Sequence, residues 1–146
     1  MSFAFNNENL EKIENLKKRY PNVHALALPC LWMVQEQEGH ISLEAIDEVS
    51  KTIDMPSTKI YAVATFYSMF YLEPQDKLVV DVCKTLSCKL CGSDEILKHL
   101  ENNDDVHVRH VECLGSCGTA PAMAIDDVYY ENLTTQKVDE ILKELK

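Results

Sequence analysis

The stretch DVCKTLSCKLCGS, residues 81–93, holds three of the chain's six cysteines, and two more follow in VECLGSCGTAPA, residues 111–122. Cys83 and Cys88 are separated by four residues, and Cys113 and Cys117 by three. Two local pairs of thiolates suit a two-iron cluster, because each tetrahedral iron already holds two bridging sulfides and has two positions left for protein sulfur. The spacing therefore favours an iron–sulfur site.

Three other interpretations of the cysteines stay open. Cys83, Cys88 and Cys91 spell C-x4-C-x2-C, the plant-type ferredoxin spacing, whose fourth ligand would be Cys113 or Cys117. The C-x-x-C formed by Cys88 and Cys91 is typical of dithiol oxidoreductases. Four thiolates also bind structural zinc, although zinc sites favour C-x2-C pairs.

Composition excludes several classes of function. The chain has 146 residues, 46% of them hydrophobic, which is enough for one or two small folded domains. With 14 basic and 24 acidic side chains the net charge is −10, so nucleic acid is not an expected partner. No apolar run approaches the roughly 18 residues of a membrane span, so no direct membrane insertion is expected. The amino terminus has no secretory pattern, which predicts a cytoplasmic protein, where six cysteines serve as metal or redox ligands rather than disulfides.

Helical periodicity dominates residues 1–73. Leu10, Ile13, Leu16 and Tyr20 indicate a first helix. A second is expected from a cap at Asn22 to Gly39, with Pro29 either near its start or at a kink. Ser42 is expected to cap a third helix that ends at Met55–Pro56, and a fourth is marked by Ile60, Val63, Ala64 and Tyr67. This half is predicted to be a helical bundle.

From residue 74 to residue 146 the pattern of apolar residues changes from a helical period to alternation with a period of two, which is typical of strands. Strands are expected at 77–83, 106–113 and 119–126, and VYYEN is expected to form a hairpin partner around Asp126–Asp127. Ser93 is expected to cap a helix over 93–102, and the tail from Thr134 forms a last helix. The order strand, helix, strand, strand, helix predicts a small mixed sheet covered by two helices. The whole chain is therefore α+β, a helical segment (1–73) followed by an α/β domain (74–146).

Longer motifs carry a family resemblance. YAVATFYSMF at 61–70, DVCKTLSC at 81–88, VECLGSCGTAP at 111–121 and YYENLT at 129–134 resemble the thioredoxin-like [2Fe–2S] ferredoxin subunit of NADH-linked oxidoreductases. That family includes the E subunits of NADH–quinone oxidoreductases, the 24 kDa subunits of complex I, and related modules of NAD-linked hydrogenases and formate dehydrogenases. The resemblance covers nearly the whole chain and implies a thioredoxin-like second domain.

The resemblance also implies a ligand set. The family's cluster ligands match Cys83, Cys88, Cys113 and Cys117, which would together hold one [2Fe–2S] cluster. Cys91 departs from the family, which more often has another residue there. The 25 positions from Cys88 to Cys113 are fewer than is usual in the family, and this shortening makes the strand over 106–113 a weaker prediction.

The implied function is that of a one-electron carrier in NADH–quinone oxidoreductase, not catalytic alone. FMN and NADH are expected on a flavin- and NADH-binding partner subunit, since this chain has only 4 glycines and no G-x-G-x-x-G fingerprint. Other iron–sulfur subunits are further expected partners, and the location is cytoplasmic or in a peripheral arm at the inner face of the membrane. The alternatives are the same module in a hydrogenase or formate dehydrogenase, and a dithiol oxidoreductase using Cys88 and Cys91.

The remaining residues give weaker signals. Lys84, Thr85 and Ser87 are candidates for hydrogen bonds to cluster sulfur. Cys30 is expected to be a small buried hydrophobe. The aromatic stretch around Phe66 and Phe70 is expected to form core contacts, with any exposed part able to dock a partner.

Overall fold

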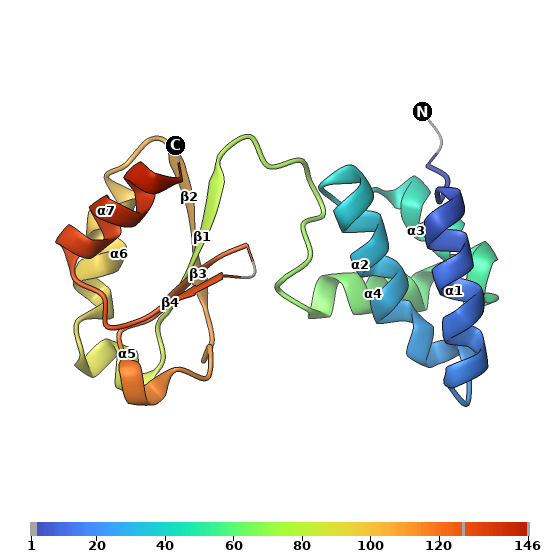
Figure 1. Ribbon diagram of the computed structural model, residues 1–146, viewed down its shortest axis with the longest axis horizontal. Coiled ribbons are helices and arrows are strands. Elements are labelled where there is room, and N and C mark those ends of the chain that lie inside the picture. Colours follow the sequence, from blue (N-terminus) through green and yellow to red (C-terminus); the bar gives the residue numbers. More distant parts are fainter. Residues whose placement is uncertain (1–2, 127, 146) are drawn as a thin grey trace. The chain divides into compact units, whose positions relative to one another are not determined.

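The computed structural model describes residues 3–126 and 128–145. The chain divides into two compact units, Met1–Gln75 and Asp76–Lys146. Each unit has its own apolar core, one built from side chains between Phe5 and Phe70 and the other from side chains between Val80 and Leu142. Figure 1 shows helices in the first unit and a sheet with helices in the second, which confirms the predicted α+β class.

The first unit is built from helices, two of which, α1 and α3, begin with a side-chain cap. The Asn6 side chain accepts a hydrogen bond from the Asn9 N–H at 2.8 Å, and Ser42 accepts one from the Ala45 N–H at 3.1 Å. Ser42 is therefore the helix cap that the sequence predicted. The elements, in order, are α1 (Asn7–Arg19), the 3₁₀ turn η1 (Val23–Leu26), α2 (Ala27–Glu38), α3 (Leu43–Ile53) and α4 (Ser57–Phe66).

The second helix begins later than its predicted cap at Asn22. Residues 23–26 form the 3₁₀ turn η1, and α2 starts at Ala27. Pro29 thus lies in the first turn of α2, where N–H groups have no partner within the helix and a proline removes no hydrogen bond. Gly39 ends α2 with a φ of 77°, a left-handed conformation that glycine adopts without strain.

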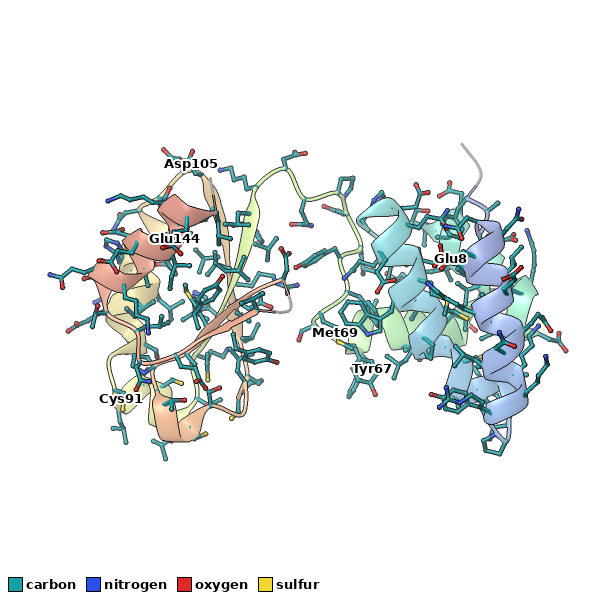
Figure 2. All side chains as sticks on the ribbon, viewed as in Figure 1. Glu8, Tyr67, Met69, Cys91, Asp105 and Glu144 are labelled. Atoms are coloured by element: carbon teal, nitrogen blue, oxygen red, sulfur yellow. The ribbon has the colours of Figure 1, made fainter. Side chains whose placement is uncertain are left out.

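Two glutamines of α2 fix segments that lie far away in the sequence. The Gln35 amide donates to the Met69 carbonyl at 2.9 Å and accepts from the Tyr71 N–H at 2.7 Å. The Gln37 amide donates to the Ala4 carbonyl at 2.9 Å. The chain leaving α4, on which Figure 2 labels Met69, is thereby held against α2.

The second unit is a mixed sheet with helices. Its strand order is β2-β1-β3-β4, in which β1 and β2 are parallel and the other neighbours antiparallel. Figure 1 shows α6 and α7 side by side along this sheet, and Val80, Val82 and Met123 are fully buried in the core that they share with it. The elements are β1 (Leu78–Cys83), α5 (Leu86–Leu90), α6 (Ser93–Glu101), β2 (Val106–Val111), the 3₁₀ turn η2 (Cys117–Thr119), β3 (Met123–Ile125), β4 (Val128–Tyr130) and α7 (Thr135–Glu144).

Two sequence predictions for this unit need correction, and one element was not predicted. The strand expected over 119–126 is confined to Met123–Ile125, because residues 117–119 form the turn η2 and Pro121 has no N–H to pair. Ser93 does not cap α6; Gly92 does, with a φ of 98°. The short helix α5 was not expected at all. The hairpin partner is present as β4, whereas Asp127 of the predicted turn lies outside the described residues.

The shortened connection before β2 is a tight turn. The Asn103 N–H donates to the Leu100 carbonyl at 2.9 Å and the Val106 N–H to the Asn103 carbonyl at 3.4 Å. Figure 2 labels Asp105 at this turn. Residues 106–111 then pair with β1 in parallel register along the full length of both strands, so the weaker strand prediction over 106–113 is confirmed, except that the strand ends at Val111.

The helices of the described ranges are all too short or too polar to cross a membrane.

Candidate metal centre

The two cysteine pairs come from loops at the same edge of the sheet. Cys83 is the last residue of β1 and Cys88 lies in α5, while Cys113 follows the end of β2 and Cys117 begins η2. Because β1 and β2 are neighbouring parallel strands, the chain leaves both at one edge. Figure 1 shows α5 and η2 side by side there.

Cys83 and Cys88 form the inner pair, with exposed fractions of only 1% and 2%. Burial raises the pKa of Cys83, but hydrogen bonds from the Thr85 hydroxyl at 3.2 Å and from the backbone N–H groups of Thr85 and Leu114 outweigh it, so the pKa lies below its ordinary value. Burial, followed by the hydrogen bond with Cys83, raises the pKa of Cys88 to about 11. The Ala122 N–H acts in the opposite direction on Cys88.

Cys113 and Cys117 form the outer, exposed pair, and their sulfurs are 3.5 Å apart. The Gly115 N–H donates to the Cys113 sulfur at 3.3 Å and, with the Cys117 thiol, lowers the pKa of Cys113. The hydrogen bond to Cys113 raises the pKa of Cys117, while the Ser87 hydroxyl acts in the opposite direction. Gly115 has a φ of 84°, the backbone conformation that lets its N–H turn back to the sulfur.

The two pairs lie next to each other. Leu114, which follows Cys113, packs with Ala120 against the buried cluster of Cys83, Cys88 and Ala122. The helix α5, which carries Cys88, contacts η2, which begins at Cys117. The pairs therefore lie close enough for their charges to interact.

This donor set fits a [2Fe–2S] core. It consists of thiols alone, in two pairs, with hydrogen-bond donors already directed at the sulfurs, as all-cysteine clusters require. Among the residues that the structure describes, no group of three or more His, Cys, Asp or Glu side chains is arranged to hold one metal ion. A two-iron core differs from a single ion because it distributes four sulfurs over two metals.

The other two cysteines lie apart from this network. Figure 2 shows Cys91 at the end of α5, where it is exposed, and the hydrogen bonds described above do not include it. Cys30 is fully buried in the core of the first unit, and burial raises its pKa to about 12. It is the small buried hydrophobe that the sequence indicated.

The aromatic stretch after α4 is divided between core and surface. Phe70 packs edge-on against Trp32, with ring centroids 5.4 Å apart. Phe66, by contrast, is 80% exposed and contacts Tyr67 edge-on at 5.0 Å. The prediction of core contacts therefore holds for Phe70 but not for Phe66.

The sequence leads one to expect backbone N–H donors from the cysteine loops but does not identify which residues supply them. The N–H groups of Leu114 and Ala122 act on cysteine sulfurs, yet leucine and alanine side chains carry no signal for this role. Only the neighbouring Gly115 indicates an unusual backbone conformation in that loop.

Comparisons with known proteins agree with this arrangement. The family model described as thioredoxin-like [2Fe-2S] ferredoxin matches residues 13–146. The NADH-quinone oxidoreductase E subunit of Rickettsia typhi is 39% identical over 98% of this chain and 92% of its own length. The E 2 subunit of the same enzyme in Rhizobium meliloti is 32% identical over 93% of this chain and 88% of its own. The first alignment spans 159 positions, more than the 146 residues present here, so the relative contains insertions.

The solved structures show the same fold. A chain of an NAD+-reducing [NiFe]-hydrogenase in the air-oxidized state superposes with a TM-score of 0.68 at 19% identity, over 82% of this chain. This chain spans 22% of the length of that hydrogenase chain. The sequence match over nearly the whole length, together with the paired thiols, identifies this chain as a member of the thioredoxin-like [2Fe–2S] ferredoxin family.

Proposed function

We propose that this chain is the one-electron carrier subunit of an NADH–quinone oxidoreductase, and that Cys83, Cys88, Cys113 and Cys117 ligate its [2Fe–2S] cluster. One observation carries the ligand assignment: Leu114, next to Cys113 in the outer pair, packs against the buried cluster that contains Cys83 and Cys88 of the inner pair. When bound, such a cluster takes up and releases one electron at a time. The cluster-binding domain is proposed to comprise residues 74–146.

A flavin- and NADH-binding subunit is the proposed partner, alongside other iron–sulfur subunits. NADH delivers two electrons as hydride, so a flavin must stand between it and a one-electron carrier. The relatives are named as subunits of NADH-quinone oxidoreductase, which supports such an assembly. We propose a cytoplasmic location, in an arm of the complex that does not itself enter the membrane.

The thiol geometry argues against a dithiol oxidoreductase that uses Cys88 and Cys91. A reactive thiol needs access to solvent and a lowered pKa. Cys88 is only 2% exposed, and burial raises its pKa to about 11. It therefore lacks both properties of an attacking thiolate.

Spectroscopy of the purified full chain tests the proposal. We expect two irons and two sulfides per chain, visible absorbance, and an electron paramagnetic resonance signal after reduction by dithionite. Cys91→Ser should keep this signal, whereas Cys117→Ser should lose or alter it. A colourless protein that contains zinc would contradict the function, and loss of the cluster in Cys91→Ser would assign the plant-type ligand set instead.

A further inference from the structure

Thr85 stands at the amino-terminal cap of α5 but does not cap it. The side chains of Asn6, Ser42 and Thr134 accept backbone N–H hydrogen bonds at the starts of their helices, at 2.8, 3.1 and 3.2 Å. Thr85 occupies the same position in α5, and its hydroxyl makes no capping hydrogen bond. The hydroxyl instead lies 3.2 Å from the sulfur of Cys83.

Cys113 of the other pair feels the same hydroxyl more weakly: its pKa is lowered first by the Gly115 N–H and the Cys117 thiol, and then by Thr85. The Ser87 hydroxyl, two residues further on, partly opposes the rise that Cys113 causes in the pKa of Cys117. The Lys84 ammonium group forms a salt bridge with the Glu112 carboxylate at 4.0 Å. The negative charge of Glu112 partly offsets the effect of the Lys84 charge on the cysteine sulfurs.

We propose that Thr85 is a positioning residue that sets the reduction potential of the cluster by donating a hydrogen bond from its hydroxyl to the sulfur of Cys83. This inference rests on the proposed function. A ligated thiolate can only accept hydrogen bonds, so the Thr85 hydroxyl must be the donor once iron is bound. The electron that enters on reduction adds negative charge to the sulfurs, and a donor therefore stabilises the reduced form more than the oxidised form.

The burial of the inner pair increases this effect. Cys83 is 1% exposed, and a hydrogen bond in a poorly solvated environment acts more strongly than one in water. Removal of the hydroxyl should consequently shift the midpoint potential to a more negative value. The cluster itself should remain, because the cysteines and the backbone donors of Leu114 and Gly115 are unchanged.

The test compares Thr85→Val, which removes the hydroxyl at nearly constant volume, with Thr85→Ser, which keeps it. Iron, sulfide and absorbance establish cluster content, and a dithionite titration followed by electron paramagnetic resonance gives the midpoint potential. We expect a more negative potential for Thr85→Val and a wild-type potential for Thr85→Ser. Thr65→Val is the matched control, since the Thr65 hydroxyl bonds the Tyr61 carbonyl of its own helix at 3.0 Å.

If Thr85→Val binds the cluster and has the wild-type midpoint potential, this inference is overturned and the proposed function is left intact. If the wild-type protein binds no cluster, both are overturned. An equal shift in Thr85→Val and Thr85→Ser would also overturn this inference, because packing would then be the cause. Should Thr85→Val load poorly, resonance Raman spectra of the Fe–S stretching bands in H2O and D2O supply the second readout. The deuterium shift of these bands should be smaller in Thr85→Ala than in wild type, and an equal shift would count against the inference.

Discussion

Ser42 and Ser93 place the same hydroxyl group in two different environments. Ser42 accepts the Ala45 N–H at 3.1 Å and so satisfies an otherwise unpaired donor at the start of α3. The Ser93 hydroxyl is fully buried and has no hydrogen-bond partner in the part of the chain that the structure describes. A buried hydroxyl without a partner destabilises the fold, whereas a capping hydroxyl stabilises it.

Alanine substitutions at the two serines should therefore act in opposite directions. Ser93→Ala should raise the free energy of unfolding by about 1 kcal/mol, because it removes an unsatisfied buried group. Ser42→Ala should lower it by about 1 kcal/mol through loss of the cap. Urea denaturation followed by circular dichroism measures both, and a loss of stability in Ser93→Ala would show that its hydroxyl has a partner.

Cys30 makes the free energy of unfolding decrease as the pH rises into the alkaline range. Burial raises its pKa from an ordinary 9.0 to about 12, so the unfolded chain loses this proton at lower pH than the folded chain does. The neutral buried thiol thus contributes its full stability below about pH 9, and this contribution is lost as the pH rises towards 12.

Cys30→Ala should weaken this pH dependence. Between pH 8 and pH 10 the wild type should lose roughly 1 kcal/mol more unfolding free energy than the variant, because only the wild type has this thiol to ionise on unfolding. Urea denaturation at the two pH values gives the comparison. Both pH values are needed, since the smaller side chain leaves a cavity that lowers stability at each of them; equal losses in the two proteins would contradict the assignment.

At the scale of elements, Gln35 acts as a clamp between α2 and the segment that follows α4. Its amide makes both a donor and an acceptor hydrogen bond to backbone groups at residues 69 and 71. Gln35→Ala should lower the free energy of unfolding by about 2 kcal/mol, because two backbone groups lose their partner. In the same variant, hydrogen exchange of the Tyr71 backbone N–H should become faster.

Gln75→Ala is the matched control for this clamp. The Gln75 amide donates to the nearby Glu73 carbonyl at 2.8 Å in an exposed position, so its loss should change stability by less than about 0.5 kcal/mol. Unchanged exchange of Tyr71 in Gln35→Ala would show that other contacts hold the segment.

The elements that periodicity predicts well are those with long, one-sided apolar patterns. Ile46, Val49 and Ile53 mark the buried face of α3, and its cap at Ser42 is a local signal, whereas Leu43, which the same pattern placed on that face, is exposed. The helix α5 escapes prediction because its five residues, Leu86–Leu90, are too few to display a helical period, and both of its leucines are exposed. Ser93 is displaced from the cap because the left-handed Gly92 directly before it takes that position.

In the site, too, features that depend on neighbouring residues are predictable from the sequence, whereas features that depend on packing are not. Two cysteine pairs after strands are visible in the sequence, and parallel pairing of β1 with β2 brings their loops to one edge. The direction of the Thr85 hydroxyl and of the Leu114 N–H depends on how the loops pack, which no residue type encodes.

At the scale of the whole molecule, the cluster should stabilise one unit more than the other. All four proposed ligands lie in Asp76–Lys146, and the core of Met1–Gln75 contains none of them. Binding to the folded state alone stabilises the part that holds the ligand. Chelation of iron under reducing conditions should therefore increase amide exchange across β1 and β2 while leaving α2 and α3 unchanged.

Exchange measured by mass spectrometry on loaded and stripped protein separates the two units. An equal increase in α3 and in β1 would show that the units unfold together and that the cluster stabilises both.

The contrast between an inner and an outer thiol pair gives cluster assembly a direction. Solvent reaches Cys113 and Cys117 but hardly reaches Cys83 and Cys88. If these cysteines ligate the cluster as proposed, iron and sulfide, or a preassembled cluster from a delivery protein, would arrive from the side of the outer pair. Oxygen and chelators would approach by the same route, so damage to the finished cluster would begin on the side of Cys113 and Cys117.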